Sequence, residues 1–135
     1  MYQMTGMLLL ALSLALPAAV RAKEPVRIGA LYSVTGTMAI SEASLRDALV
    51  MLVEQQNQRG GLLGRPLELV ALDPASNWPM YGEKARQLIE REKVAVIFGC
   101  WTSASRKEVK AAVEELNGLL FYPVQYEGQE QSPNI

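Results

Sequence analysis

The sequence predicts an α/β fold, in which a parallel sheet carries helices on both faces. Short apolar runs alternate with segments of helical periodicity along the chain, and such alternation is typical of parallel sheets joined by crossover helices. The runs are apolar almost throughout, as expected for strands that are buried on both faces. The 135 residues are 50% hydrophobic and 20% charged, a composition typical of one globular unit.

The first predicted strand covers residues 26–32, which read VRIGALY and lead into a polar loop. A helix is expected to follow, with Ser41 as its N-cap. Gly60 and Gly61 should end this helix, because glycine readily adopts the left-handed conformation of a helix C-terminus. The buried face of the helix is predicted from apolar residues at helical spacing, which are Leu45, Ala48, Leu49, Leu52 and Val53.

The remaining elements continue the same alternation. The second predicted strand is residues 67–72 (LELVAL), and the helix after it has Pro79 in its first turn, where proline is well tolerated. The third strand is residues 94–98 (VAVIF), the most β-prone run of the chain. A third helix is marked by apolar residues within 109–116, and the fourth strand is residues 119–122.

The N-terminal segment is set apart from this fold. Residues 7–20 are apolar and uncharged, but they are shorter than the roughly 20 residues that a membrane-spanning helix needs. Small residues follow them, as at a signal cleavage site. We therefore expect residues 1–22 to be a signal peptide and the protein to be periplasmic, although the first six residues lack Lys and Arg. An uncleaved anchor is the alternative.

The composition excludes several kinds of chemistry. The chain has no histidine and one cysteine, so it cannot form a Ser-His-Asp triad, a Cys-His dyad, a His-ligated zinc site or an intrachain disulfide. Its formal net charge of -1 gives no basic face for nucleic acid. We expect no enzymatic activity, no cofactor or metal, and no nucleic-acid partner.

Many polar and aromatic side chains lie in the loops that follow the predicted strands. Ligands of open α/β sheets bind beyond the carboxyl ends of the strands, and the loops there are rich in hydroxyls, amides and aromatic rings. Such groups suit a small neutral polar molecule, whereas an amino acid would also want a carboxylate for its ammonium group. The candidate ligand contacts are Ser33, Thr37, Asp73, Trp101, Thr102, Ser103, Tyr122, Gln125 and Tyr126.

Several of these loop residues have an alternative structural role. Asp73 can cap the turn after it, and Thr102 or Ser103 can N-cap the third helix. Cys100 at a strand end can be a nucleophile or a buried thiol, and the absence of histidine favours the thiol. The basic set in the third helix is interpreted as a solvated face and comprises Arg106, Lys107 and Lys110.

Several long segments of the sequence resemble segments of the periplasmic urea-binding proteins of ABC transporters. Together they cover essentially all of residues 25–135. Their number and order make the resemblance specific. They are SVTGTMAISE (33–42), NxxGGxxGR (57–65), DPASNWP (73–79), GCWTSxSRK (99–107), NGLLFYPVQYEG (117–128) and SPNI (132–135).

The resemblance implies a type I periplasmic binding protein, which has two α/β lobes that close on a ligand. Residues 23–135 would be its N-terminal, flavodoxin-like, ligand-binding lobe, with the second lobe absent and half a cleft that binds urea weakly or not at all. Urea or a short-chain amide would be the ligand, and ABC permease subunits in the membrane the partners. First-lobe contacts would come from residues 101–103, then from Tyr122, Gln125 and Tyr126, and after these from Ser33 and Thr37. An amide-sensing regulatory domain and, after it, a branched-chain amino-acid binding protein are the alternatives.

Overall fold

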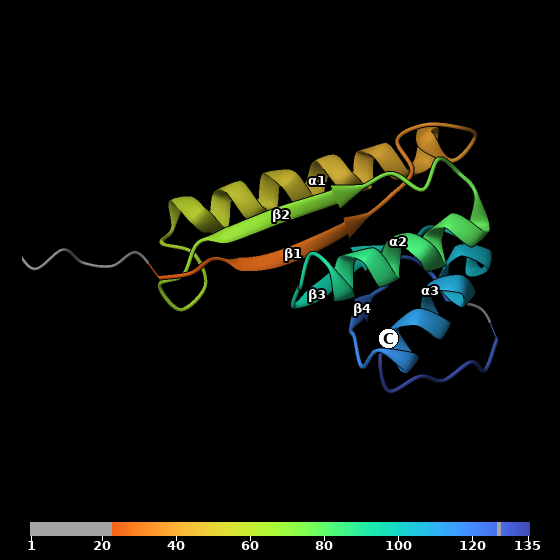
Figure 1. Ribbon diagram of the computed structural model, residues 1–135. Helices are drawn as coiled ribbons and strands as arrows, with labels where there is room; N and C mark the ends of the chain where they lie inside the picture. Colours follow the sequence, from red (N-terminus) through yellow and green to blue (C-terminus); the bar gives the residue numbers. More distant parts are fainter. Residues whose placement is uncertain (1–22, 127) are drawn as a thin grey trace, which may run out of the picture.

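The computed structural model describes residues 23–126 and 128–135, and these form one α/β lobe (Figure 1). The predicted signal peptide lies outside the described residues. The order of strands and helices is the predicted one, and the elements are β1 (Val26–Leu31), α1 (Ala39–Gln58), β2 (Leu67–Leu72), α2 (Trp78–Glu90), β3 (Val96–Gly99), α3 (Ser103–Glu115) and β4 (Leu120–Phe121).

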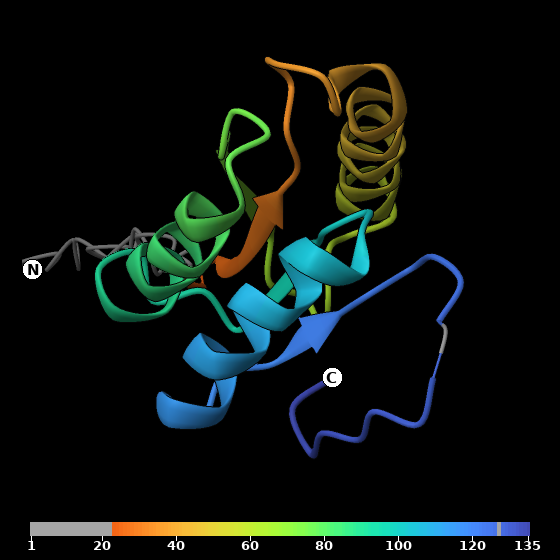
Figure 2. The ribbon, with the colours of Figure 1, turned by 90° about the vertical axis from the view of Figure 1, so that its right-hand side faces the viewer.

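The sheet is parallel throughout, in the order β2-β1-β3-β4, as predicted. From β1 the chain crosses to β2 through α1, and it then returns past β1 to β3 through α2. Right-handed crossovers in opposite directions place α1 on one face and α2 and α3 on the other, and Figure 2 shows α1 apart from the α2–α3 pair. The strand order reverses between β1 and β3, the kind of switch point at which α/β proteins bind ligands.

The main core lies between the sheet and the α2–α3 pair. The face covered by α1 is less deeply buried: Val53 is buried and Leu45 and Leu49 are half-buried, but Ala48 and Leu52 of the predicted stripe are exposed. The prediction that Ala48 and Leu52 are buried was therefore wrong. Helix α1 packs mainly along β2 and β1, and these two residues lie outside that contact. The buried hydrophobic cluster consists of Leu31, Tyr81, Ala85, Leu88, Ile97, Cys100, Val109, Ala112, Val113 and Leu120.

The helix starts correct one prediction and confirm another. Helix α1 begins at Ala39, so Ser41 lies inside the helix and is not its N-cap. In α2, Pro79 does occupy the first turn, and the side chain of Asn77 accepts a hydrogen bond from Met80 N. Helix α3 is capped by Thr102, whose Oγ1 accepts from Ser105 N at 3.1 Å.

We expect replacement of Thr102 by alanine to destabilise the lobe by about 1 kcal/mol, the usual effect of losing an N-cap hydroxyl. The loss removes the reciprocal bonding in which Ser105 Oγ also accepts from Thr102 N. Guanidinium chloride unfolding followed by circular dichroism measures the effect. Thr37→Ala, at an exposed loop position, is the matched control, and equal midpoints for the two variants would refute the capping role.

Candidate ligand site at the carboxyl edge of the sheet

Four loops follow the carboxyl ends of the strands and form the candidate site. We name them the first loop (33–38), the second loop (73–77), the third loop (100–102) and the fourth loop (122–126 and 128–130). The parallel sheet places all four at the same edge. Hydrogen bonds join the first loop to the second and the third loop to the fourth.

Asp73 joins the second loop to the first. Its Oδ2 accepts a hydrogen bond from Thr35 Oγ1 at 2.7 Å, and its Oδ1 accepts from Val34 N at 3.2 Å and from Ala75 N at 2.8 Å. Burial alone would raise the pKa of Asp73, but these bonds outweigh it and hold the pKa below its usual value. Both carboxylate oxygens are therefore engaged within the protein, which supports the turn-capping interpretation of Asp73.

Ser76 completes this connection between the loops. Its Oγ donates to Thr35 O at 2.8 Å and accepts from Met38 N at 2.9 Å, so the first turn of α1 is tied to the second loop. Gly36 has a φ of +78°, and a Cβ there would lie 2.6 Å from Ser76 Oγ. Glycine is therefore required at this position both by backbone conformation and by space.

A buried carboxyl group lies beneath the first loop. Glu42 has no exposed surface; its Oε2 accepts from Ser33 N at 2.5 Å, and both of its oxygens lie within 2.7 Å of Tyr81 OH. Ser33 Oγ is bonded to Tyr81 OH at 2.7 Å and accepts from Ser76 N at 2.8 Å. Burial raises the pKa of Glu42, and the bonds from Tyr81 and Ser33 offset only part of that rise.

This environment gives a pH dependence with a definite sign. Because the pKa of Glu42 is higher in the folded than in the unfolded state, its contribution to stability is fully present below the unfolded value. It is lost as the pH rises through the folded value. We expect the wild type to lose stability relative to Glu42→Gln, which cannot ionise, as the pH rises from about 4 to 7.

Guanidinium chloride unfolding across that pH range tests the sign. Glu54→Gln on the same helix, at an exposed position, is the control and should follow the wild-type curve. A difference between wild type and Glu42→Gln that stays constant with pH, or that grows in favour of wild type, would contradict the buried-carboxyl interpretation.

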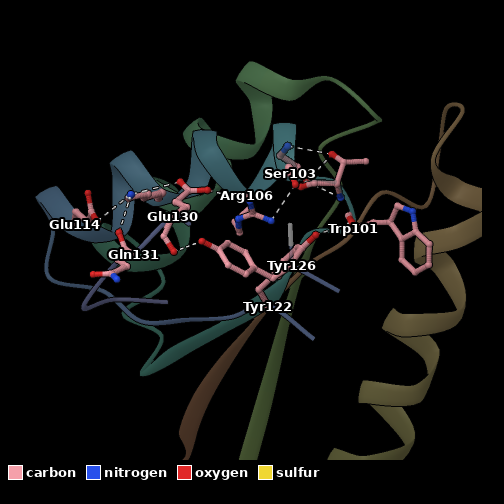
Figure 3. A network of polar contacts seen from close by, with 11 residues as sticks. Trp101, Ser103, Arg106, Glu114, Tyr122, Tyr126, Glu130 and Gln131 are labelled. Carbon is pink, nitrogen blue, oxygen red and sulfur yellow. Dashed lines mark hydrogen bonds and ion pairs between the residues drawn. The ribbon is translucent and has the colours of Figure 1, made fainter. Parts of the chain in front are cut away.

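The third and fourth loops meet at Trp101. Tyr122 OH donates to Trp101 O at 2.9 Å, so a side chain of the fourth loop is hydrogen-bonded to the backbone of the third loop. The indole of Trp101 is half-buried and points away from the polar cluster around Arg106 (Figure 3). Its ring therefore remains able to contact a ligand.

The largest correction concerns Arg106. The sequence pattern predicted a solvated helix face for this residue, but it is 2% exposed. Its guanidinium lies over the rings of Tyr122 and Tyr126, forms an ion pair with Glu130 at 2.9 Å, and donates to Ser103 Oγ at 3.1 Å. No local pattern could have revealed this burial, because Glu130 is 24 residues away.

The structure brings the candidate residues together in two groups. Ser33 and Asp73 belong to the bonded first and second loops; Ser33 is fully buried, so it contributes to the loop support. The other group gathers around Arg106 and Trp101 and contains Thr102, Ser103, Tyr122 and Tyr126. Thr37 and Gln125 are exposed and lie outside these two bonded groups. Direct ligand contact by any of the nine candidates stays a prediction.

Cys100 is buried, as the sequence favoured. Burial raises the pKa of its thiol to about 12, so the thiolate that a nucleophile requires is scarce at neutral pH.

Within residues 23–126 and 128–135, no group of three or more His, Cys, Asp or Glu side chains could hold a metal ion. No helix in the same ranges is long and apolar enough to cross a membrane.

The sequence profile of the periplasmic binding protein domain matches residues 26–135. The chain belongs to this family. It is 37% identical over 116 residues to Leu/Ile/Val-binding protein homolog 7 of Brucella melitensis biotype 1, and 32% identical over 113 residues to homolog 8 of Brucella suis biovar 1. Each match covers 84% of this chain but only 29% and 28% of the relative, so the chain spans less than a third of their length.

Solved structures of two substrate-binding proteins share the fold. An ABC transporter substrate-binding protein from Sphaerobacter thermophilus is 29% identical, with a TM-score of 0.66 over 72% of this chain and 26% of that one. An amino acid ABC transporter substrate-binding protein from Pseudomonas fluorescens Pf-5 is 27% identical, with a TM-score of 0.69 over 78% and 27%. The predicted fold of a periplasmic-binding-protein lobe is thereby confirmed, whereas the curated relatives are named for leucine, isoleucine and valine and not for urea.

Proposed function

We propose that this chain is part of the solute-binding component of an ABC transporter and that its solute is a branched-chain amino acid. The observation that carries this proposal is the 37% identity, over 84% of the chain, to a relative named for leucine, isoleucine and valine. This changes the order of the hypotheses from the sequence, in which urea or a short-chain amide came first.

The geometry of α3 supports an oxygen-bearing ligand. The helix begins at Ser103 beside the switch point of the sheet, and the N–H groups of its first turn favour a carboxylate or a carbonyl oxygen. Thr102 is occupied by the capping box. We propose that the carboxylate of the amino acid lies at this helix end, with the Trp101 ring excluding water from it.

The ammonium group of an amino acid needs a carboxylate partner. Three carboxylates of the described chain that lie near the loops are already engaged. Asp73 is held by the first loop, Glu42 is buried beneath it, and Glu130 is paired with Arg106 and Lys110. We propose that residues 23–135 form the N-terminal lobe of a two-lobed clamp and that the second lobe supplies the ammonium partner.

The cellular setting follows from the same proposal. Residues 1–22 would serve as a signal peptide, and the mature protein would act in the periplasm. There it would deliver its solute to ABC permease subunits in the membrane. Binding, and not catalysis, is the activity that we assign to it.

Urea or a short-chain amide remains the second candidate. It is favoured by the engagement of the carboxylates just described, since a neutral amide needs no ammonium partner. Its carbonyl oxygen would use the same donors at the start of α3. The sequence segments that resemble urea-binding proteins support this second candidate independently.

Titration calorimetry can decide between the two ligands. The chain is titrated alone, and also after fusion to the remainder of the Brucella melitensis relative, which completes a two-lobed protein, with L-leucine, L-isoleucine, L-valine, urea and acetamide. We expect the fusion to bind the three amino acids at micromolar concentrations, as is usual for a closed cleft. The chain alone should bind them only at millimolar concentrations, because half a cleft leaves the ligand in water.

The second lobe belongs to a relative, so its preference must be separated from that of the first. The unmodified relative is therefore titrated in parallel as the control. Binding of urea or acetamide without leucine by the fusion would replace the first candidate by the second. Failure to bind any of the five compounds would overturn both.

A further inference from the structure

Arg106 lies at a position that is electrostatically unfavourable for a cation. It lies in the first turn of α3, where the helix dipole disfavours a cation, and its side chain is 3% exposed. Removing a charge from water is unfavourable, and one ion pair often fails to offset the lost hydration. Its Nε is buried with no hydrogen-bond partner among the described residues, so even its bonding is incomplete.

The contacts of Arg106 join the start of α3 to the fourth loop. On the fourth loop, the guanidinium centre lies 4.8 Å from the ring centroid of Tyr122 and 5.1 Å from that of Tyr126, and Nη2 is paired with Glu130 (Figure 3). At the start of α3, Nη1 donates to Ser103 Oγ. One flat, forked group thus contacts four side chains that come from two segments of the chain.

We propose that Arg106 is a positioning residue, which sets how Ser103 and the third loop are presented to the solute. Tyr122 links Arg106 to the third loop. Its ring lies beside the guanidinium, and its hydroxyl donates to Trp101 O. The proposal concerns the arrangement of this group, and only its consequence for affinity rests on the proposed function.

Lysine should not be able to replace Arg106 in this role. An ammonium group is a compact point charge, whereas guanidinium is planar, lies over aromatic rings and donates in several fixed directions. Arg106→Lys keeps the charge that pairs with Glu130 but cannot also lie over two rings and reach Ser103. Arg106→Met keeps the apolar stem, while Lys110 remains 3.4 Å from Glu130 to pair with it.

A purely stabilising role and a positioning role predict different results. Arg106→Met removes only one partner of the ion pair, but Glu130 is 21% exposed and keeps Lys110 as its partner, so the remaining carboxylate is neither unpaired nor fully buried. Arg106→Met should therefore remain folded. The position of the third loop can be read from Trp101 once it is the sole tryptophan, in a Trp78→Phe background. Acrylamide quenching then reports the exposure of its indole without any ligand.

We expect Arg106→Lys and Arg106→Met to keep the wild-type circular dichroism spectrum. Both should raise the acrylamide quenching constant of Trp101 about twofold, because the guanidinium contacts no longer fix the loop that carries the indole. In the two-lobed fusion, both should weaken L-leucine binding about tenfold. Ser103→Ala, which removes only the hydroxyl, should reproduce part of the affinity loss. Lys107→Met, an exposed neighbour on the same helix, is the matched control and should change neither measurement.

Wild-type quenching in Arg106→Lys would overturn the proposal, and so would unfolding of Arg106→Met, since that would make the role structural. If the fusion binds no amino acid, the proposed function fails, but the quenching comparison still decides the role of Arg106.

Discussion

Replacing Leu88 by alanine is expected to lower the free energy of unfolding of the lobe by about 3 kcal/mol, in the range for large-to-small changes in a packed core. Leu88 has no exposed surface and belongs to the buried cluster between the sheet and the α2–α3 pair. A Cβ at Gly29 of β1 would lie only 3.0 Å from Leu88 Cδ1, so the side chain packs directly against the backbone of a central strand. The loss of these contacts leaves a cavity that a close-packed sheet cannot fill by small movements.

Guanidinium chloride unfolding measures this change, which is a large fraction of the roughly 5–15 kcal/mol that stabilises a typical domain. Leu52→Ala in α1 is the matched control, because that leucine is 56% exposed and should change stability little. Equal midpoints for Leu88→Ala and Leu52→Ala would show that the main core does not lie where the structure places it.

Replacing Trp101 by alanine is expected to weaken L-leucine binding by the two-lobed fusion about 30-fold or more, as for a large aromatic group at the centre of a binding surface. The unfolding midpoint should change little in comparison. The structural bond of this residue is made by its backbone oxygen, which accepts from Tyr122, and alanine retains that oxygen.

Titration calorimetry and denaturation of the same Trp101→Ala sample separate binding from folding. Trp78→Phe, which alters the other tryptophan of the chain at the start of α2, is the control and should retain its affinity. Undiminished leucine binding by Trp101→Ala would remove the third loop from the site.

The architecture could be predicted from the sequence because it depends on local patterns. The run 67–72 became β2 without a change of boundary, and Pro79 entered the first turn of α2 as expected. The start of α1 could not be predicted in the same way. Met38 N is bonded to Ser76 Oγ, so the helix begins where a partner from a distant loop satisfies its backbone, and not at its own hydroxyl residue Ser41.

The candidate site was predicted by position more than by role. The rule for carboxyl ends of parallel strands predicted that these loops share one edge of the sheet, and they do, but ligand contact there stays a prediction. The capping alternative for Thr102 was confirmed. Glu42 and Arg106 were missed as buried groups, because charged residues near helix starts are usually solvated. Their burial depends on Tyr81 and Glu130, which only the folded chain brings within reach.

The most direct test of the central claim is a ¹H–¹⁵N correlation spectrum of the isotope-labelled chain, titrated with L-leucine to roughly 50 mM, which suffices for millimolar binding. Our account predicts saturable shifts of the Trp101 and Ser103 amides at the start of α3, while Gly60 and Gly61, in the turn at the opposite edge of the sheet, stay unchanged. Saturable shifts confined to that opposite edge, or no saturable shift at any residue, would contradict it.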